Sequence, residues 1–505
     1  MKKYILILCC FFLLIGMAAC GNANTDGGGV FSSELDTDAS RWCKADGKTD
    51  DSEALKTAAA AAEAEHGRLF LKAGTYVLDK SVVLPATVTV VMEKGAVLQL
   101  HEEATLYILG TLEATNTQIF AGEGIVNART VITGNPLWFG AKGDGVTDDT
   151  EAFRKAFASF SQLELPMPEV AYVLGELETF TGMAMTASPE VEGRIPVRIA
   201  QGAQYLFRAK TGQGAFKVNG FSFDCAAMPE NSAVFHFNTA TGWIQDSYVE
   251  NCDFTDAYHV FKDDNHSAVN GLTAMMYIHF NDLVCKDGRN TAILFRDMEG
   301  FIFFKNILID NSQSYTKHGL KQGFTSVRIS GLAGNIIENV TIIGANTGKA
   351  SENGMVYSDL ACVWWDRITV KNCSGIGIQI NDANLASLVA VDVSGCGTGI
   401  STSTCNWFQL ERVTANNCKT DGFTISSGRW TQLNNCNASQ NGRCGLRVVG
   451  CINAQINGGV YTENGEHGAN LSGTSVTLLN TQMTGNPRGA YTSVANSFLV
   501  ENVTE

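Results

Sequence analysis

The chain has 505 residues, of which 45% are hydrophobic and 17% charged, and its formal net charge is −15. This length and hydrophobic content suit a large folded core, and together they exclude a largely disordered chain. The acidic balance excludes a general nucleic-acid binder, although a local cluster of basic residues could still bind an acidic polymer.

An export signal is predicted at the N-terminus. Lys2 and Lys3 precede a short apolar run, residues 4–17, and Ala18-Ala19-Cys20 follows. This arrangement is typical of a cleaved signal peptide, residues 1–19, rather than of a membrane span. Cys20 and the polar, glycine-rich stretch after it resemble a bacterial lipobox with a flexible tether, residues 20–42. The resemblance implies an exported protein with a lipid anchor on Cys20, held in a bacterial membrane at the cell surface or in the periplasm. Ordinary secretion is the alternative.

Two segments, residues 46–54 and 144–152, share the pattern Asp-Gly-x-Thr-Asp-Asp-(Ser/Thr)-Glu-Ala. A glycine turn followed by acidic and hydroxyl residues predicts a short capped helix in each segment, so we interpret the paired aspartates as structural. The run from Trp138 to Thr150 resembles the opening of the pectate-lyase-like superfamily of right-handed parallel β-helices. That superfamily includes polysaccharide lyases, polygalacturonase-like hydrolases, alginate epimerases and phage tailspikes. Two openings predict a small strand-rich module, residues 43–135, before a β-helix domain, residues 136–505; one continuous solenoid is the alternative.

Short apolar strands recur through the second half of the chain. Between residues 235 and 360 they are spaced by 23, 34, 33 and 29 residues, and they centre near Phe237, Val260, Leu294, Val327 and Val356. Later the spacing settles at 22 or 23 residues, as in the glycines Gly377, Gly399, Gly422, Gly445 and Gly468. Repeats of this length with alternating apolar residues predict an all-β fold, a single-stranded parallel β-helix with three short strands in each coil. Its right hand is implied by the resemblance.

The irregular coils, residues 235–360, are the predicted functional site, because long loops on a rigid scaffold tend to carry function. Between Asp282 and Arg328, Lys and Arg outnumber the acids by seven to five, against the acidic background of the chain. Such a site suits a polymer of uronic acids, which a lyase cleaves by β-elimination. In that reaction cations neutralise the carboxylate, a base removes the proton at C5 and an acid protonates the leaving oxygen.

We therefore predict that Arg296 and Arg328 are neighbours on successive strands and neutralise the carboxylate of pectin, alginate or a glycosaminoglycan. The base and the acid are predicted among Tyr315, Lys317, His318 and Lys321. The residues predicted to bind substrate are His236, Asn238, His259, Lys262, Arg289, Tyr357 and Gln379.

Hydrolysis is a second hypothesis. Three short motifs follow the order found in polygalacturonase-like hydrolases: Asp263-Asp264, His318-Gly319 and Arg328-Ile329. However, the chain lacks Asn-Thr-Asp, no glycine precedes His318, and Ser330 stands where those hydrolases have Lys. These departures put the two carboxyl groups that hydrolysis requires in doubt.

A protein that binds glycans without catalysis is the third hypothesis, and Trp364, Trp365 and Trp407 could stack on sugar rings. The predicted chemistry requires no cofactor. Calcium is the ion that scattered acids could hold, because it prefers oxygen ligands; the candidate ligands are Asp263, Asp264 and Asp297. The expected partner is an acidic polysaccharide and not a nucleic acid, and the sequence leaves a monomer and a trimer open.

Overall fold

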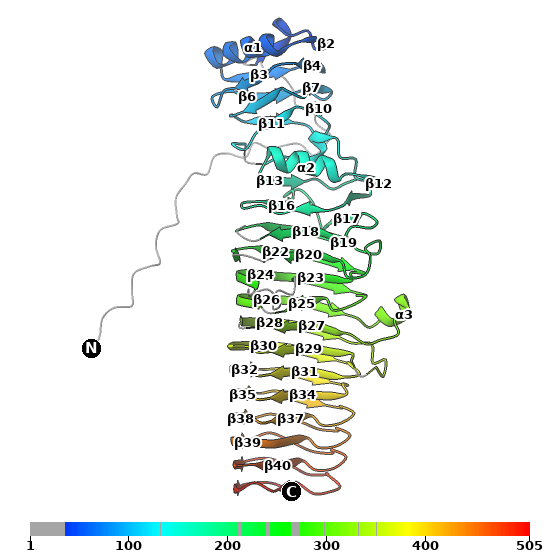
Figure 1. Cartoon of the computed structure of the whole chain (residues 1–505), viewed down its shortest axis with the longest axis vertical. Coiled ribbons are helices and arrows are strands. Elements are labelled where there is room, and N and C mark those ends of the chain that lie inside the picture. Colours follow the sequence, from blue (N-terminus) through cyan, green and yellow to red (C-terminus); the bar gives the residue numbers. More distant parts are fainter. Residues whose placement is uncertain are drawn as a thin grey trace, which may run out of the picture.

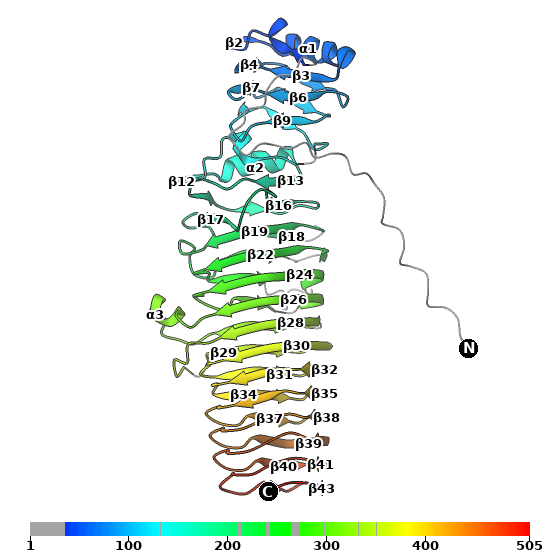
Figure 2. The ribbon, with the colours of Figure 1, turned by 180° about the vertical axis from the view of Figure 1, so that it is seen from behind.

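The chain forms a long parallel β-solenoid (Figure 1). The computed structural model describes residues 36–505, except residues 132, 211–213, 239–242, 264–272, 297, 332 and 350. Views from both sides show the coils stacked one on another towards the C-terminus (Figures 1 and 2), so the predicted parallel β-helix is confirmed. Within the described residues, every helix is too short or too polar to cross a membrane.

The two Asp-Gly openings lead into helices α1 (Ser52–Glu65) and α2 (Thr150–Ser159), as predicted. The helix-capping carboxylate is the first aspartate of each pair: Asp148 Oδ1 accepts a hydrogen bond from the backbone N–H of Thr150 at 2.9 Å. The second aspartate turns back instead, and Asp149 accepts hydrogen bonds from the N–H groups of Lys142 and Gly143 at 2.6 and 3.1 Å. Both members of the pair therefore stabilise the turn and the helix start.

The strands before residue 128 form three small parallel sheets. These are β1 (Thr37–Asp38), β3 (Arg68–Leu71), β6 (Thr89–Met92) and β9 (Leu112–Ala114); β2 (Asp46–Asp50), β4 (Gly74–Leu78), β7 (Ala96–Leu100) and β10 (Phe120–Gly122); and β5 (Val82–Leu84), β8 (Thr105–Ile108) and β11 (Ile125–Asn127). Two 3-10 helices are η1 (Ala39–Arg41) and η2 (Pro136–Phe139). The rings of Trp138 and Phe160, 5.7 Å apart, join the core of this part to the coils that follow.

From residue 144 onwards the strands pair in two long parallel series, which we name the first and the second sheet. The first sheet consists of β15 (Leu177–Glu178), β18 (Tyr205–Lys210), β20 (Ala233–Asn238), β23 (His259–Asp263), β25 (Ile293–Phe295), β27 (Thr325–Ser330), β29 (Asn353–Ser358), β31 (Ile376–Asn381), β34 (Thr398–Ser403), β37 (Phe423–Ser426), the start of β39 (Leu446–Asn457), β40 (Ala469–Gly473) and β42 (Tyr491–Ser493). The strands predicted near Phe237, Val260, Leu294, Val327 and Val356 all lie in this sheet.

The second sheet wraps the rest of each coil. It consists of β12 (Asp144–Asp148), β13 (Gln162–Leu165), β14 (Ala171–Leu174), β16 (Ala184–Ala187), β17 (Ile195–Ile199), β19 (Lys217–Asp224), β21 (Trp243–Gln245), β22 (Tyr248–Thr255), β24 (Thr273–Lys286), β26 (Met298–Asp310), β28 (Ala333–Ile343), β30 (Cys362–Lys371), β32 (Asn384–Val389), β33 (Asp392–Ser394), β35 (Asn406–Glu411), β36 (Thr414–Asn416), β38 (Arg429–Asn434), the end of β39, β41 (Ser475–Leu479) and β43 (Ser497–Glu501). Helix α3 (Ser314–His318) projects from the loop between β26 and β27 (Figure 1).

Equivalent residues of successive coils stack inside the solenoid. Phe207, Phe235 and Phe261 form one such inward row, with ring centroids 5.0 and 5.3 Å apart. In the C-terminal coils the row of Asn441, Asn464 and Asn486 is buried instead. The Nδ2 of Asn464 donates hydrogen bonds to Asn486 Oδ1 at 3.1 Å and to the backbone oxygen of Ala438 at 3.0 Å.

We expect Asn464→Ala to lower the free energy of unfolding by about 2–4 kcal/mol, because it leaves buried amide partners on both sides unsatisfied. Urea denaturation measures this change. The matched control is Asn406→Ala, which removes a similar but solvent-exposed bond to Asn384 Oδ1 at 3.0 Å and should cost less than about 1 kcal/mol. Equal losses in the two variants would contradict a stabilising role for the buried ladder.

Candidate functional site

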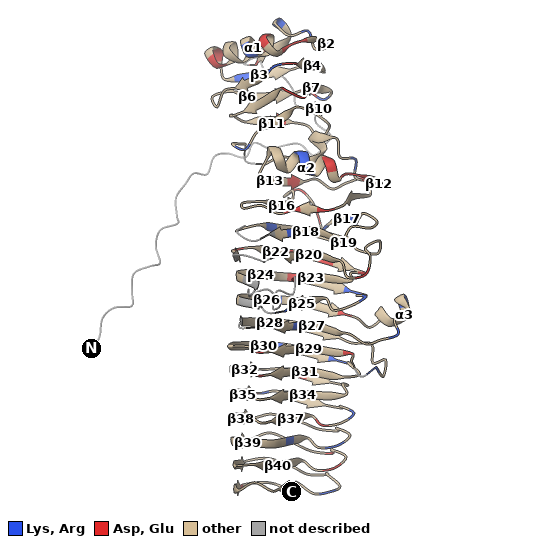
Figure 3. Cartoon of the chain, in the orientation of Figure 1, with Lys and Arg blue, Asp and Glu red and all other residues tan. Residues whose placement is uncertain are grey.

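Basic residues recur on the strands of the first sheet, where Figure 3 colours the ribbon blue at Lys and Arg, as on β18. The strand register places Arg208 beside His236, His236 beside Lys262, and Lys262 beside Leu294, which pairs with Arg328. We name Arg208, His236, Lys262 and Arg328 the basic row. Because parallel strands lie about 4.8 Å apart, the row spans about 19 Å over five coils. After Arg328 the same register continues through the uncharged Val356, Gln379, Ser401 and Thr424 to Arg447, and before Arg208 it begins with Glu178.

Arg208 is the member of this row that the sequence interpretation missed. Its guanidinium lies over the ring of Tyr205, 5.5 Å from the ring centroid, and that ring is 6.2 Å from the imidazole of His236. Among the described residues, the buried Nε of Arg208 has no hydrogen-bond partner, so it can donate to a bound anion. The sequence contains a pattern that could have revealed Arg208, because apolar and polar residues alternate towards the end of Tyr205–Lys210, as they do in the later strands.

The sequence predicted that Arg296 and Arg328 are neighbours on successive strands, but the two residues are not directly opposite each other. Arg328 is exposed and pairs with Leu294, whereas Arg296 lies two residues further on, just beyond β25. The backbone N–H of Arg296 donates a hydrogen bond to Asp263 Oδ2 at 2.8 Å. Its buried Nε has no hydrogen-bond partner within the described residues. The two arginines therefore lie diagonally at one end of the basic row, close enough to bind different groups of one polymer.

His259 and Asp263 sit at the two ends of β23, and both are buried. His259 is 4% exposed, and its Nδ1 lies 2.5 Å from the backbone oxygen of Thr291, so Nδ1 carries the proton. Burial is the main cause that lowers the pKa of His259 to about 4; the hydrogen bond to Thr291 opposes the shift, and the nearby charges of Lys262 and Arg296 add to it. The ring is therefore neutral at pH 7 and supports the strand, which corrects its predicted contact with substrate.

Asp263 points into the solenoid rather than towards the basic row. Its register partners in the neighbouring coils are the buried Phe237 and residue 295, and the Phe237 and Phe295 rings are 5.8 Å apart. Asp264 and Asp297 lie outside the described residues. In the described part of the chain, His, Cys, Asp and Glu form no group of three that could hold a metal ion, and calcium remains a prediction.

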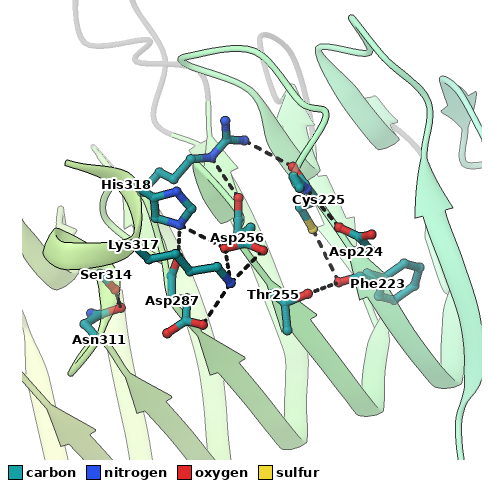
Figure 4. Close-up of polar contacts among 12 residues, drawn as sticks. Phe223, Asp224, Cys225, Thr255, Asp256, Asp287, Asn311, Ser314, Lys317 and His318 are labelled. Carbon is teal, nitrogen blue, oxygen red and sulfur yellow. Dashed lines mark hydrogen bonds and ion pairs between the residues drawn. The ribbon is translucent and has the colours of Figure 1, made fainter. Parts of the chain in front are cut away.

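Helix α3 brings a second polar cluster to the edge where the first-sheet strands begin (Figure 4). The Nζ of Lys317 lies 2.7 Å from Asp256 Oδ1 and 3.0 Å from Asp287 Oδ2. The Nε2 of His318 is 2.9 Å from Asp256 Oδ1 and 2.9 Å from the backbone oxygen of Asp287. The hydrogen bond to Asp256 raises the pKa of Lys317, and Asp287 adds to the rise against a smaller effect of desolvation. Lys317 is thus held as a cation, which is unfavourable for a base.

The other predicted residues divide between the loop and the core. Arg289 donates hydrogen bonds to the backbone oxygens of Asp256 and Cys225, at 2.8 and 3.1 Å, and so holds two turns together. The Tyr315 hydroxyl accepts a hydrogen bond from the N–H of Phe324 at 3.1 Å, and burial raises the pKa of this tyrosine.

Three further residues complete the predicted set. Tyr357 is fully buried against Trp365, with ring centroids 4.6 Å apart, so its predicted contact with substrate is wrong. Lys321 is exposed on the α3 loop, and Gln379 lies two coils beyond Arg328 in the same register. Asn238 ends β20, but its side chain lies outside the described part, as does the whole of Cys20.

Comparison with known proteins agrees with the fold. The family model of the right-handed β-helix region matches residues 321–451. No curated protein matches the sequence. Among solved structures, the A-module of the Azotobacter vinelandii mannuronan C-5 epimerase AlgE6 is 13% identical, with a TM-score of 0.41, over 73% of this chain and 98% of that one. The Dettilon tailspike protein is 11% identical, with a TM-score of 0.43, over 73% and 68%. Similarity at this level says nothing about the reaction.

The buried His259 predicts a pH dependence of stability. Its pKa is lower in the folded chain than in the unfolded one, so the unfolded state binds the proton more readily, and stability falls as the pH drops from about 6.5 to 4. We expect this residue to account for a loss of about 1–3 kcal/mol over that range. Urea denaturation at pH 7 and pH 4.5 should show a smaller difference for His259→Gln than for the unchanged protein. His66→Gln, at an exposed histidine, is the control and should leave the difference as it was.

Proposed function

We propose that the protein is a polysaccharide lyase that binds a uronic-acid polymer along the basic row and cleaves it by β-elimination. The observation that carries this proposal is the register of Arg208, His236, Lys262 and Arg328 on one exposed face. A polymer with a carboxylate on its sugars presents negative charge at regular intervals, and basic side chains on four of five successive coils suit it. The chain as a whole has a net charge of −15, so this local excess of cations is a property of the face.

The chain offers groups for each step of the elimination. Arg296 and Arg328 neutralise the substrate carboxylate, which makes the proton at C5 more acidic. Lys262, which lies one coil from Arg296, removes that proton in its neutral form, the electron pair forms the C4–C5 double bond, and the bond from C4 to the glycosidic oxygen breaks. The leaving oxygen takes a proton from a neighbouring group of the row or from water. Lys317 and His318, which are engaged with Asp256 and Asp287, hold the α3 loop at the border of the site.

Hydrolysis is less well supported, because it needs two carboxyl groups that face the scissile bond. Asp263 is directed into the solenoid and is fully buried. Among the described residues in the register of the basic row, the acidic residue is Glu178. It pairs with Arg208, at the end of the row far from Arg328. The aspartate that stands next to Asp263 in the sequence, Asp264, lies outside the described residues.

The N-terminal sequence indicates where in the cell the protein acts. We infer that the protein is exported and anchored by a lipid on Cys20, because residues 1–20 have the composition of a lipoprotein leader. The tether predicted over residues 20–42 is too long at its end, because Thr37–Asp38 form β1 and Ala39–Arg41 form η1, with Thr37 and Ala39 buried in the solenoid. The residues between Cys20 and β1 would act as the tether that separates the solenoid from the membrane. A lyase in this position would meet polysaccharide outside the cytoplasm.

The test is incubation with pectin, alginate, hyaluronan, chondroitin sulfate and heparin, with and without a chelator, while the ultraviolet absorbance of unsaturated uronate is followed. We expect a rise on at least one polymer, and a loss of activity by about 10²-fold or more in Arg328→Ala and Lys262→Ala. Lys305→Ala is the matched control, since Lys305 is exposed on the second sheet beside Glu338, at 3.7 Å, and should leave the rate unchanged.

Other outcomes separate the remaining hypotheses. New reducing ends without ultraviolet absorbance would show hydrolysis and overturn the lyase. Retention of a polymer without any cleavage would show a binding protein. Loss of activity with the chelator would establish a divalent cation in the reaction.

A further inference from the structure

A second outward row, on the second sheet, is apolar rather than basic. The strand register places Tyr248, His279, Phe303, Ile336 and Trp364 side by side on five successive coils. The first three rings are stacked: Tyr248 and His279 are 4.7 Å apart, and His279 and Phe303 are 4.5 Å apart, each pair within 5° of parallel. Trp364 at the end of the row is 47% exposed.

In the next three coils the apolar residues lie two positions before the register partner of Trp364, which is Ser387. Leu385, Trp407 and Trp430 stand in register there, and they are 54%, 58% and 49% exposed. The two indoles are 5.3 Å apart and within 9° of parallel. We name the eight side chains the aromatic ridge: Tyr248, His279, Phe303, Ile336, Trp364, Leu385, Trp407 and Trp430. At about 4.8 Å for each coil, the ridge is about 34 Å long.

The tryptophans of the ridge gain little burial on folding, and they occupy turns of a kind that elsewhere holds residues such as Ala390 and Arg412. Leu385, Trp407 and Trp430 have φ angles of 58°, 55° and 57°, a left-handed conformation that bulky residues rarely adopt. In the following coil Asn453 occupies the same place with a φ of 58°, and asparagine adopts this conformation readily. The indoles thus strain the backbone at positions where they remain about half exposed and gain little burial. Strained and exposed residues of this kind are more often retained for binding.

The borders of the ridge are polar but have no excess of charge. The amides of Gln409 and Gln432 follow the two tryptophans along their strands. Asn384, Asn406 and the exposed Arg429 precede this part of the ridge, and the two asparagines are joined by a hydrogen bond of 3.0 Å. The acid Glu338 beside the ridge is paired with Lys305 and with Arg367. This balance contrasts with the basic row, and it favours an uncharged ligand over an anionic one.

We propose that the aromatic ridge binds an uncharged polysaccharide chain that lies along the axis of the solenoid. The apolar faces of the sugar rings pack against the exposed parts of the indoles, and the amides at the border exchange hydrogen bonds with the sugar hydroxyls. A strip one or two side chains wide matches a linear polymer, whereas a stable protein partner needs a broad patch of about 800 Å². This site is separate from the basic row and does not depend on the reaction there.

Affinity gel electrophoresis of the protein in gels that contain mannan, galactan, arabinan, xylan or β-glucan tests the proposal. We expect at least one of these polymers to retard the protein, and the double variant Trp407→Asn with Trp430→Asn to lose about ten-fold or more in affinity. Asparagine suits the left-handed backbone, as at Asn453, so the variant should keep or raise the urea midpoint of unfolding. Asn453→Gly, at the same place in the following coil, is the control that should bind as the unchanged protein does.

Two results would overturn the proposal. One is that none of the five polymers retards the protein, or that the double variant is retarded equally. The other is that sedimentation velocity shows a dimer or trimer that the double variant dissociates, because the ridge would then join copies of this chain. A negative lyase assay would not affect either measurement, since the basic row is intact in these variants.

Discussion

The in-register stacking of parallel coils is the constraint on which this structure depends. Each backbone N–H and C=O pairs with the coil above or below, so a residue cannot move along its strand without breaking a ladder of hydrogen bonds. Side chains at equivalent positions are therefore forced into straight rows. Inside the solenoid these rows must match in shape, as in the phenylalanines Phe207, Phe235 and Phe261 or in the asparagine ladder around Asn464.

Outward rows have no such requirement, so their composition can serve binding. The basic row and the aromatic ridge use the same spacing of coils with different chemistry. One places Arg208, His236, Lys262 and Arg328 on the first sheet, and the other places stacked rings on the second. A solenoid of this kind can hold a charged polymer and an uncharged one on separate faces, because each face repeats independently.

The α3 loop shows how the fold uses charge for support. Lys317 and His318 meet Asp256 and Asp287, which come from two different coils, and Arg289 bonds to the backbone of the same turns (Figure 4). These contacts tie a projecting loop to the body of the solenoid. The carboxylates that face Lys317 also keep it protonated, so the group that resembles a catalytic lysine in the sequence acts as an anchor in the fold.

The sequence by itself determined the repeat, the parallel β-helix, the capped helices after each Asp-Gly turn and the strands that form the first sheet. These features are periodic or local, so spacing and alternation are enough to find them. The tertiary structure alone decided which side chains share a row: it added Arg208, set Arg328 beside Leu294 instead of Arg296, and turned Asp263 and Tyr357 into the core. It also aligned Trp407 with Trp430 next to the row that ends at Trp364. Coils of unequal length hide the register, since it is set by hydrogen bonds between coils and not by distance along the chain.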